Sequence, residues 1–478
     1  MPEKDWRGQR VLIIGAARQG LALARYLVLH GAEVILNDRR PEAVMQDAQE
    51  SLADLNPLRR LTWVLGDHPL ITLEGVDLVC PSGGVPLDMP LVAEAVRRGV
   101  PLSNDSQIFL EAVPCPVIGI TGSAGKTTTT MLVGRMAQAA SQTASGAGEL
   151  EPGYRPRNVW VGGNIGAPLI SEVDEMSPED LAVMELSSFQ LEIMTRSPQV
   201  AAILNITPNH LDRHGSMQAY TAAKKRILDF QTSQDAAVLS RDDPGAWSMR
   251  ESVHGKLVTF GLNQQKPGQE DVFLDGEHVA LQTGGQVTPI MERSAVELRG
   301  EHNLVNVLAA CAIAAAANLP VSAMRAGVAG FEGAPHRLEF IRSWGGADWY
   351  NDSIATAPER AMAAIRSFDE PLILLAGGRD KNLPWEDFAS LVSRRVDHLV
   401  VFGEAADKIL AAMHQQEVQG SRTKIHRADG LKQAMEIAAQ IVQPGYVVLL
   451  SPGGTSFDEF KDFEERGECF ARWVKELP

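Results

Sequence analysis

The sequence predicts an α/β protein of three successive domains, each built on a largely parallel sheet. The chain has 478 residues, which is more than one hydrophobic core usually serves. Short β-branched runs alternate with helical patterns along its length, as in parallel strands joined by helices. A glycine-rich segment with one lysine, residues 119–128, follows an apolar run, as a strand-to-helix turn would. We expect domains at residues 1–104, 105–333 and 334–478.

The first domain is predicted to be Rossmann-like. We expect strands at 10–14, 33–36 and 76–80 and a helix at 21–30. Gly15-Ala-Ala-Arg-Gln-Gly20 follows the first strand, but it lacks the central glycine of a dinucleotide fingerprint. Asp38 ends the second strand. Three interpretations remain open: a nucleotide phosphate at the helix start with Asp38 near the sugar or base, NAD binding, or a plain tight turn.

Residues 119–128 predict a phosphate-binding loop in a central domain of the P-loop ATPase type. Glycines let backbone N–H groups surround an anion, and the following helix adds its positive N-terminus. Lys126 can reach the β- and γ-phosphates, and the Thr127 hydroxyl can bind Mg²⁺. The strict motif has glycine where this chain has Ile120, so the loop is a variant. We predict a nucleoside triphosphate site that includes Gly122, Ser123, Gly125, Lys126, Thr127 and Thr128.

Polar clusters follow other predicted strands of the central domain. Glu185 comes directly after the apolar run 181–184, so its carboxylate would emerge beside the phosphate loop and could bind Mg²⁺. His210 and Lys224 lie in two further clusters. Taken singly, such a histidine is more often a hydrogen-bonded loop residue, and such a lysine a solvated helix charge. Their combination indicates a metal-and-phosphate site.

The remaining elements complete the predicted order. Residues 139–157 are rich in Ser, Gly, Pro and Thr, so we expect a mobile insertion there. A strand is expected at 200–204, and an alanine-rich helix at 303–317 would close the central domain. The third domain is predicted to be Rossmann-like, with strands at 372–375, 398–402 and 446–450.

Composition excludes several classes of function. The net charge is −16 at pH 7 and basic residues form no run, so a nucleic-acid-binding face is not expected. Cys80, Cys115, Cys311 and Cys469 are far apart, which argues against a zinc site and a disulfide framework. The charged N-terminus and the lack of an 18-residue apolar run argue against secretion and membrane insertion. We expect a cytoplasmic monomer.

Taken together, the motifs resemble those of the Mur ligase family of ATP-dependent amide-bond ligases. The resemblance extends over nearly the whole chain and implies that glutamate is added to UDP-N-acetylmuramoyl-L-alanine in peptidoglycan precursor synthesis, hence in cell wall biogenesis and cell division. It rests on residues 121–128, 162–166, 185–192, 210–214, 300–306, 336–337 and 450–458.

The resemblance also implies roles for individual residues. An acyl phosphate would form on the substrate carboxylate and the glutamate amine would attack it. The catalytic residues would be Lys126, Asn164, His210 and Lys224. ATP would contact the phosphate loop together with Asn303, Asn306, Arg337 and Asp352. Magnesium would lie among Thr127, Glu185, His210 and a carbamylated Lys224. The UDP-linked substrate would contact Gly20, Asp38, Arg39, Ser82, Gly84 and Asn164, and glutamate would contact Thr356, Lys381, Ser456 and Phe463.

Two departures from the family pattern keep alternatives open. Ile354 and Ala357 stand where the family commonly has lysine and asparagine, so L-glutamate is an alternative to D-glutamate. Residues 82–85 read Ser-Gly-Gly-Val where Ser-Pro-Gly is usual. A non-ligating muropeptide-nucleotide sensor is a second alternative, which the intact set of metal and phosphate residues disfavours. Folylpolyglutamate synthetase is a third, and the extra N-terminal domain disfavours it.

Overall fold

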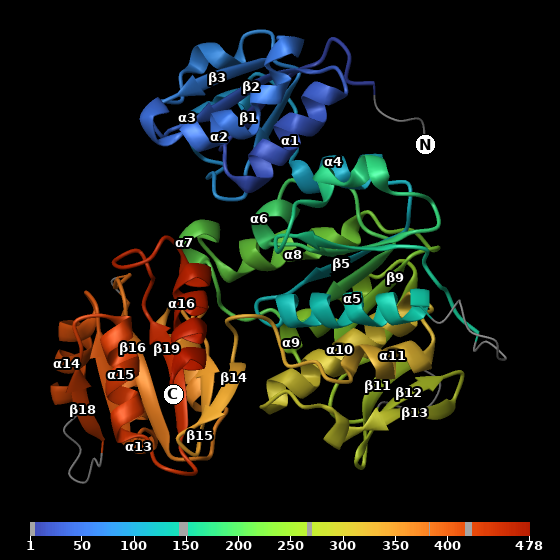
Figure 1. Cartoon of the computed structure of the whole chain (residues 1–478). Coiled ribbons are helices and arrows are strands. Elements are labelled where there is room, and N and C mark those ends of the chain that lie inside the picture. Colours follow the sequence, from blue (N-terminus) through green and yellow to red (C-terminus); the bar gives the residue numbers. More distant parts are fainter. Residues whose placement is uncertain (1–4, 143–151, 265–269, 382, 416–422) are drawn as a thin grey trace. The chain divides into compact units, whose positions relative to one another are not determined.

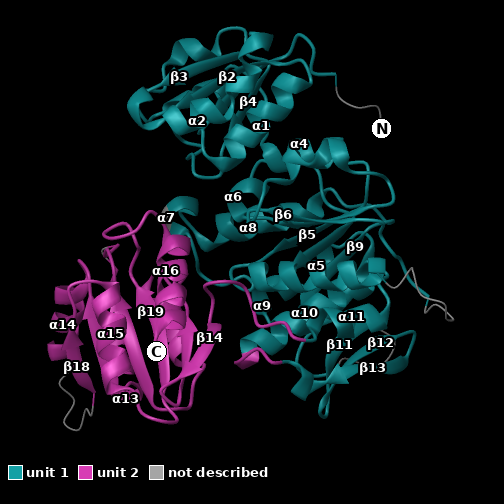
Figure 2. Ribbon diagram, viewed as in Figure 1, with its two compact units in different colours: residues 1–296, 302–329 teal, residues 297–301, 330–478 magenta. Residues whose placement is uncertain are grey.

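The computed structural model describes residues 5–142, 152–264, 270–381, 383–415 and 423–478 (Figure 1). These residues form two compact units: residues 1–296 with 302–329, and residues 297–301 with 330–478 (Figure 2). Three sheets lie within the described ranges, two in unit 1 and one in unit 2. The predicted α/β class and its three Rossmann-like and P-loop-like sheets are confirmed. The domain boundaries near 104 and 333 stay predictions.

The first sheet is parallel, with strand order β3-β2-β1-β4. Its central strand β1 is buried from Val11 to Ile14, since it is covered on both faces. The expected strands and helix are confirmed, while β3 was not predicted. The elements are β1 (Arg10–Ile14), α1 (Arg18–Leu29), β2 (Glu33–Asp38), α2 (Gln46–Ser51), β3 (Leu61–Leu65), β4 (Leu78–Pro81) and α3 (Pro90–Arg97).

The second sheet has nine strands in the order β13-β12-β11-β10-β9-β8-β5-β7-β6. The strands from β6 to β11 pair in parallel, whereas β11, β12 and β13 pair antiparallel. Strand β5 lies between β7 and β8, so three strand ends meet around the phosphate loop. The strands are β5 (Val117–Thr121), β6 (Val159–Gly163), β7 (Leu181–Glu185), β8 (Val200–Ile203), β9 (Ala236–Ser240), β10 (Lys256–Phe260), β11 (Glu270–Asp275), β12 (His278–Thr283) and β13 (Gln286–Glu292).

Helices α5 and α11 pack closely against each other beside this sheet (Figure 1). A side chain at Gly327 of α11 would lie 2.7 Å from the backbone nitrogen of Met136, so only glycine permits this approach. The Arg135 guanidinium donates to the Gly327 carbonyl at 2.8 Å. The helices are α4 (Asp105–Ala112), α5 (Lys126–Gln142), α6 (Ser188–Leu191), α7 (Leu211–His214), α8 (Met217–Asp229), α9 (Pro244–Trp247), α10 (Glu301–Ala316) and α11 (Val321–Val328).

The structure corrects the start of the insertion expected at 139–157. Helix α5 continues to Gln142, because Ala140 is buried on its inner face and alanine favours helix. Residues 143–151 lie outside the described residues. The alanine-rich helix expected at 303–317 is confirmed as α10, and α11 follows it.

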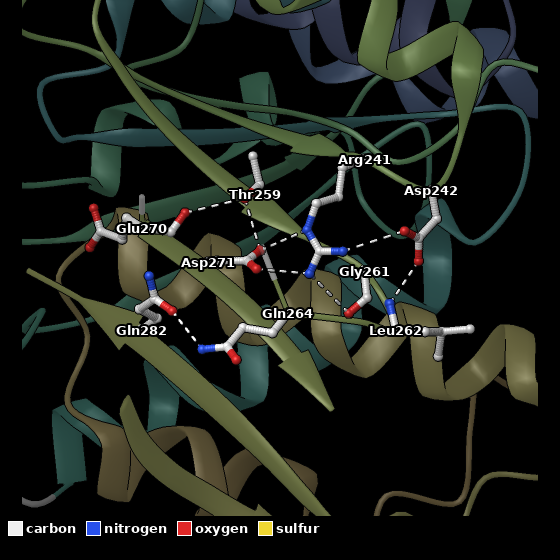
Figure 3. Close-up of polar contacts among 9 residues, drawn as sticks. All are labelled: Arg241, Asp242, Thr259, Gly261, Leu262, Gln264, Glu270, Asp271 and Gln282. Atoms are coloured by element: carbon white, nitrogen blue, oxygen red, sulfur yellow. Dashed lines mark hydrogen bonds and ion pairs between the residues drawn. The ribbon is translucent and has the colours of Figure 1, made fainter. Parts of the chain in front are cut away.

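A buried ion pair joins β9 to β11 (Figure 3). Arg241 follows β9 and binds Asp271 of β11 through two hydrogen bonds of 3.2 and 2.8 Å. Asp271 is fully buried and also accepts from the Thr259 hydroxyl at 2.8 Å. The exposed carboxylate of Asp242 lies 3.4 Å from the same guanidinium. The pair links β9 to β11 across β10, which lies between these two strands in the sheet.

We expect Asp271→Asn to lower the free energy of unfolding by about 3 kcal/mol, because it removes the buried carboxylate of the pair and leaves only the exposed Asp242 near the Arg241 guanidinium. Asp242→Asn changes the exposed partner of the same arginine, so we expect a loss of about 1 kcal/mol or less. Urea unfolding of both variants at pH 7 measures the difference. Equal losses would contradict a dominant role for the buried pair.

The sheet of unit 2 has six strands in the order β14-β15-β19-β16-β17-β18. Strands β14 and β15 form an antiparallel hairpin, and the remaining pairs are parallel. The three predicted strands correspond to β16, β17 and β19. The elements are β14 (Glu339–Trp344), β15 (Ala347–Asn351), α12 (Pro358–Ile365), β16 (Leu372–Gly377), α13 (Glu386–Arg395), β17 (His398–Phe402), α14 (Ala406–Gln415), β18 (Lys424–Arg427), α15 (Leu431–Ile441), β19 (Val447–Gly453) and α16 (Phe463–Glu476).

Among the described helices, none is long and apolar enough to cross a membrane.

Candidate active site

The phosphate loop connects β5 to α5 and folds back on itself. Lys126 begins α5, and its Nζ donates to the Gly122 carbonyl at 3.1 Å. The Ser123 hydroxyl donates to the Thr207 carbonyl at 2.9 Å. Gly125 has φ of +81°, and a side chain there would lie 2.2 Å from the Asn306 amide oxygen. Glycine at 125 is therefore required by both backbone conformation and space.

The two asparagines predicted to contact ATP lie beside this loop. Asn306 and Asn303 are buried on α10, one turn apart, and Asn306 donates to the Asn303 side-chain oxygen at 3.1 Å. The close approach of Asn306 to Gly125 brings α10 and the phosphate loop together. Gly125 and Asn306, about 180 positions apart in the chain, thus lie side by side.

Glu185 connects three segments: the end of β7, the start of α5 and the residue that follows β6. It ends β7 and is 1% exposed. Its carboxylate accepts from the Thr127 hydroxyl at 2.9 Å and from the Asn164 amide at 2.8 Å. The Asn164 backbone N–H also donates to the Glu185 carbonyl, at 2.9 Å. The structure thus brings together three of the predicted residues, and their oxygen atoms are the kind that Mg²⁺ prefers.

Lys224 reaches the same loop from α8 and is 1% exposed. Its Nζ donates to the Gly122 carbonyl at 2.9 Å and to the Thr121 hydroxyl at 3.2 Å. Burial lowers the pKa of Lys224 well below its usual value, the nearby Lys126 lowers it further, and Glu185 acts in the opposite direction. Burial therefore favours the neutral amine of Lys224, which is the nucleophilic form of a lysine side chain.

His210 lies at the start of α7 with φ of +53°, an uncommon conformation for a residue other than glycine. Its ring packs edge-on against Phe189, with centroids 5.1 Å apart. In the described part of the chain, no group of three or more His, Cys, Asp or Glu side chains could hold a metal ion. The metal role of His210 stays a prediction.

The first β–α turn of the N-terminal sheet is closed by side chains that the sequence singled out. A side chain at Gly20 would lie 1.9 Å from the Gly15 carbonyl oxygen, which excludes any larger residue. The Ser82 hydroxyl donates to that carbonyl at 3.0 Å. The Asp38 carboxylate accepts from the Ala16 N–H at 2.8 Å. Gly20, Asp38 and Ser82 therefore meet at one turn, and their contact with the UDP-linked substrate stays a prediction.

The cationic partner of Asp38 is Arg40, which the sequence did not single out. Arg40 donates to both carboxylate oxygens of Asp38, at 2.9 and 2.7 Å. Burial acts to raise the pKa of Asp38, but hydrogen bonds from Arg40 and Ala16 outweigh it and lower the pKa to about 2. Arg39 is exposed, and its predicted role in UDP binding stays a prediction.

Within unit 2, the predicted glutamate residues lie around β19 and the start of α16. Lys381 donates to the Thr356 hydroxyl at 3.3 Å. Ser456 is buried, and the Phe463 ring lies edge-on to His336 at 6.3 Å. A cation beside a hydroxyl suits a carboxylate ligand. All four residues, Thr356, Lys381, Ser456 and Phe463, stay predicted glutamate contacts.

Asp352 is a buried acid with an unusual pKa. It is 5% exposed and accepts from the Ser451 hydroxyl at 2.7 Å and from the Leu338 N–H at 3.3 Å. Burial raises its pKa to about 7, although these hydrogen bonds and the charge of Arg337 oppose the rise. The Arg337 Nε is buried and has no hydrogen-bond partner among the described residues. Both groups remain predicted ATP contacts.

We expect Asp352→Asn to increase stability at alkaline pH. An acid whose pKa is raised by folding contributes stability below its unfolded pKa of about 4, and loses that contribution as pH rises toward 7. The substitution removes the ionisable group, so the variant should match the parent near pH 4 and exceed it by about 2 to 4 kcal/mol at pH 8. Urea unfolding at both pH values tests this. A variant that is less stable at pH 8 would contradict the raised pKa.

Two family models match this chain. Residues 120–314 match the Mur ligase middle domain, and residues 336–454 match the Mur ligase, glutamate ligase domain. A UDP-N-acetylmuramoylalanine--D-glutamate ligase from Symbiobacterium thermophilum is 38% identical, with 98% of each chain covered. An enzyme of the same name from Pelotomaculum thermopropionicum is also 38% identical, with 99% of each chain covered.

Solved structures share the fold at lower identity. UDP-N-acetylmuramate-alanine ligase MurC from Thermotoga maritima aligns with a TM-score of 0.57 and 18% identity, over 98% of this chain and 99% of its own. A pseudomurein peptide ligase type C from Methanothermus fervidus aligns with a TM-score of 0.55 and 18% identity, over 98% and 100%. The family matches and the near-full-length relatives define an ATP-dependent ligase that forms amide bonds. The chain belongs to the Mur ligase family.

Proposed function

We propose that this protein joins D-glutamate to UDP-N-acetylmuramoyl-L-alanine, consuming ATP and releasing ADP and phosphate. The observation that carries the proposal is the meeting of Thr127, Asn164, Glu185 and Lys224 at the phosphate loop. Near-full-length relatives named as D-glutamate ligases support the choice of substrates. We place the reaction in the bacterial cytoplasm, carried out by a monomer without a nucleic-acid or membrane partner.

The chemistry proceeds in two steps. The terminal carboxylate of the UDP-linked substrate attacks the γ-phosphorus of ATP, which forms an acyl phosphate and releases ADP. The amine of glutamate then attacks the acyl carbon, the C–O bond to phosphate breaks, and phosphate leaves while the amine loses a proton. Such reactions depend mainly on positioning and on charge stabilisation. This assignment gives no side chain the role of nucleophile.

The residues of the site have matching roles. Lys126 offsets charge on the transferred phosphoryl group, and the loop N–H groups bind the other phosphates. Asn164 is held by Glu185 and would orient the muramoyl-alanine end of the substrate. Magnesium, when bound at Thr127 and Glu185, would neutralise phosphate charge. Thr356 and Lys381 would hold a carboxylate of glutamate.

Carbamylation of Lys224 would complete the metal ligands. The neutral amine that burial favours can add to CO₂ with loss of a proton, giving an N–C bond and a negative carbamate. A carbamate offers two oxygen atoms where the lysine offered a cation. His210 would lie near the same metal.

L-Glutamate is a second candidate for the amino-acid substrate. The observation that favours it is the pair Ile354 and Ala357, which replaces a cation and an amide on the segment that carries Thr356. An apolar residue at 354 changes the charge available to one of the two glutamate carboxylates. The rest of the proposal is unaffected.

Isotope transfer tests the acyl-phosphate step. The protein is incubated with ATP, D-glutamate and UDP-N-acetylmuramoyl-L-alanine whose terminal carboxylate carries ¹⁸O. We expect one ¹⁸O to appear in the released phosphate, because a carboxylate oxygen becomes the bridging atom and leaves with phosphorus. Ligated product with unlabelled phosphate would overturn the mechanism. Release of phosphate without any ligated product would favour a sensor or simple ATPase.

A further inference from the structure

Arg213 links the central domain to the loop that follows β4. Its Nη1 donates to the Gly84 carbonyl at 3.1 Å and its Nη2 to the Val85 carbonyl at 3.2 Å. The guanidinium lies over the Phe189 ring, 4.7 Å from the centroid. Phe189 in turn contacts His210 and His214. One exposed arginine thus spans from the segment beside the phosphate loop to a loop of the first sheet.

The loop held by Arg213, residues 82–85, is a tight turn in which the Val85 N–H donates to the Ser82 carbonyl at 2.8 Å. Ser82 anchors the turn to the Gly15 carbonyl. Its two central residues are Gly83 and Gly84, which lose more conformational freedom on ordering than any other residue type. Their N–H groups donate no hydrogen bond within the described residues. Successive free backbone N–H groups in a turn are suited to an anion.

We propose that Arg213 is a positioning residue for the UDP-linked substrate, because it holds the 82–85 turn in the conformation that receives the diphosphate. This inference rests on the proposed function. Arg213 ties down two carbonyls of the turn, so their N–H neighbours are ordered before the nucleotide arrives. The loop is then already ordered when the nucleotide binds, so the free energy of binding is not reduced by the cost of ordering it.

The geometry requires arginine rather than a simple positive charge. Two separate donors of one planar group reach two successive carbonyls, and the same plane packs against an aromatic ring. A lysine has one nitrogen on a flexible stem and cannot reproduce this arrangement. Charge alone would be preserved by lysine, while ordering of the turn would not.

The test uses Arg213→Ala and Arg213→Lys in the full chain. We expect Arg213→Ala to raise the KM for UDP-N-acetylmuramoyl-L-alanine, and to weaken binding of UDP measured by calorimetry, by about 5- to 30-fold, since two charged hydrogen bonds are lost. The KM for ATP and kcat should stay within about twofold. Arg213→Lys should bind UDP more weakly than the parent. It should recover less than half of the decrease in the logarithm of UDP affinity that Arg213→Ala causes.

A second substitution distinguishes ordering of the turn from direct contact with the substrate. Gly83→Ala narrows the backbone conformations open to the first central position of the turn, and it keeps the Gly83 N–H that is assigned to the diphosphate. Gly83 does not have a positive φ, so alanine fits its backbone conformation. A side chain there would meet only Phe189, at 3.8 Å. In the Arg213→Ala background, Gly83→Ala should recover about 2- to 5-fold in affinity, because the free turn has fewer conformations to lose.

Arg250→Ala is the matched control, because Arg250 is also an arginine over an aromatic ring, Trp247, and donates to a carbonyl away from the predicted sites. Arg250→Ala should change neither the KM for UDP-N-acetylmuramoyl-L-alanine nor the KM for ATP. If Arg213→Ala leaves UDP affinity within twofold, or weakens ATP equally, the inference is wrong. If the unsubstituted protein neither ligates nor binds UDP, the proposed function itself fails.

Discussion

Replacing Lys126 with alanine is expected to lower the rate of ligation by at least about 10³-fold, because the reaction loses the fixed cation that offsets charge on the transferred phosphoryl group. The fold should tolerate the change, since the Gly122 carbonyl keeps its hydrogen bond from Lys224 at 2.9 Å. Steady-state kcat and the KM for ATP measure the effect, and a thermal melt confirms folding. The largest change should be in kcat.

A neighbouring lysine provides the control for this variant. Lys225 is partly exposed on α8 and pairs with Asp229 within the helix, so Lys225→Ala should keep activity within about twofold. If Lys126→Ala ligated within tenfold of the parent, the phosphate loop would not be the catalytic nucleotide site. The class of reaction would then need another explanation.

Lys224→Ala is expected to reduce ligation by about 10² to 10³-fold, and chemical rescue identifies the form in which the lysine acts. If Lys224 acts as a carbamate, a short carboxylate such as propionate can fill the space left by the side chain and restore metal ligation. If it acts as a cation, ethylamine should restore activity instead. The rate of ligation with each additive, at a fixed magnesium concentration, separates these roles.

Lys224→Arg gives an independent readout of the same question. Arginine keeps a positive charge but is not expected to form a stable carbamate at neutral pH, since its guanidinium stays protonated. We expect it to be as impaired as Lys224→Ala and to be insensitive to bicarbonate. An active Lys224→Arg variant, or rescue by ethylamine alone, would contradict carbamylation and would leave Lys224 as a phosphate-binding cation.

The sequence predicts strands best where they are buried on both faces. Strands such as Arg10–Ile14 and Leu372–Gly377 are continuous apolar runs, which leave little ambiguity. Strand β3 and the antiparallel strands β11 to β13 were missed because their burial alternates or is partial, so their apolar pattern is weak. Their place in the sheets depends on tertiary packing rather than on local propensity.

The positions of candidate site residues could be predicted from the sequence where polar residues lie at or just after the end of a strand. Glu185 and Thr127 were placed correctly because parallel strands present their carboxyl ends at one edge. The sequence could not distinguish Arg39 from Arg40 as the partner of Asp38, since both follow the strand and only the backbone path decides. The motif at residues 210–214 includes Arg213, but the sequence assigned this arginine no role, because the carbonyl it contacts lies about 130 positions away in the chain.

Competition between glutamate enantiomers tests the central claim most directly. The protein is given ATP, UDP-N-acetylmuramoyl-L-alanine and equal concentrations of deuterated D-glutamate and unlabelled L-glutamate, and the mass of the ligated product is measured. Product carrying only the deuterated residue is the predicted result, and Ile354 and Ala357 would then be tolerated variation. Product carrying the unlabelled residue would contradict D-glutamate addition and would make these two positions candidates for stereochemical choice.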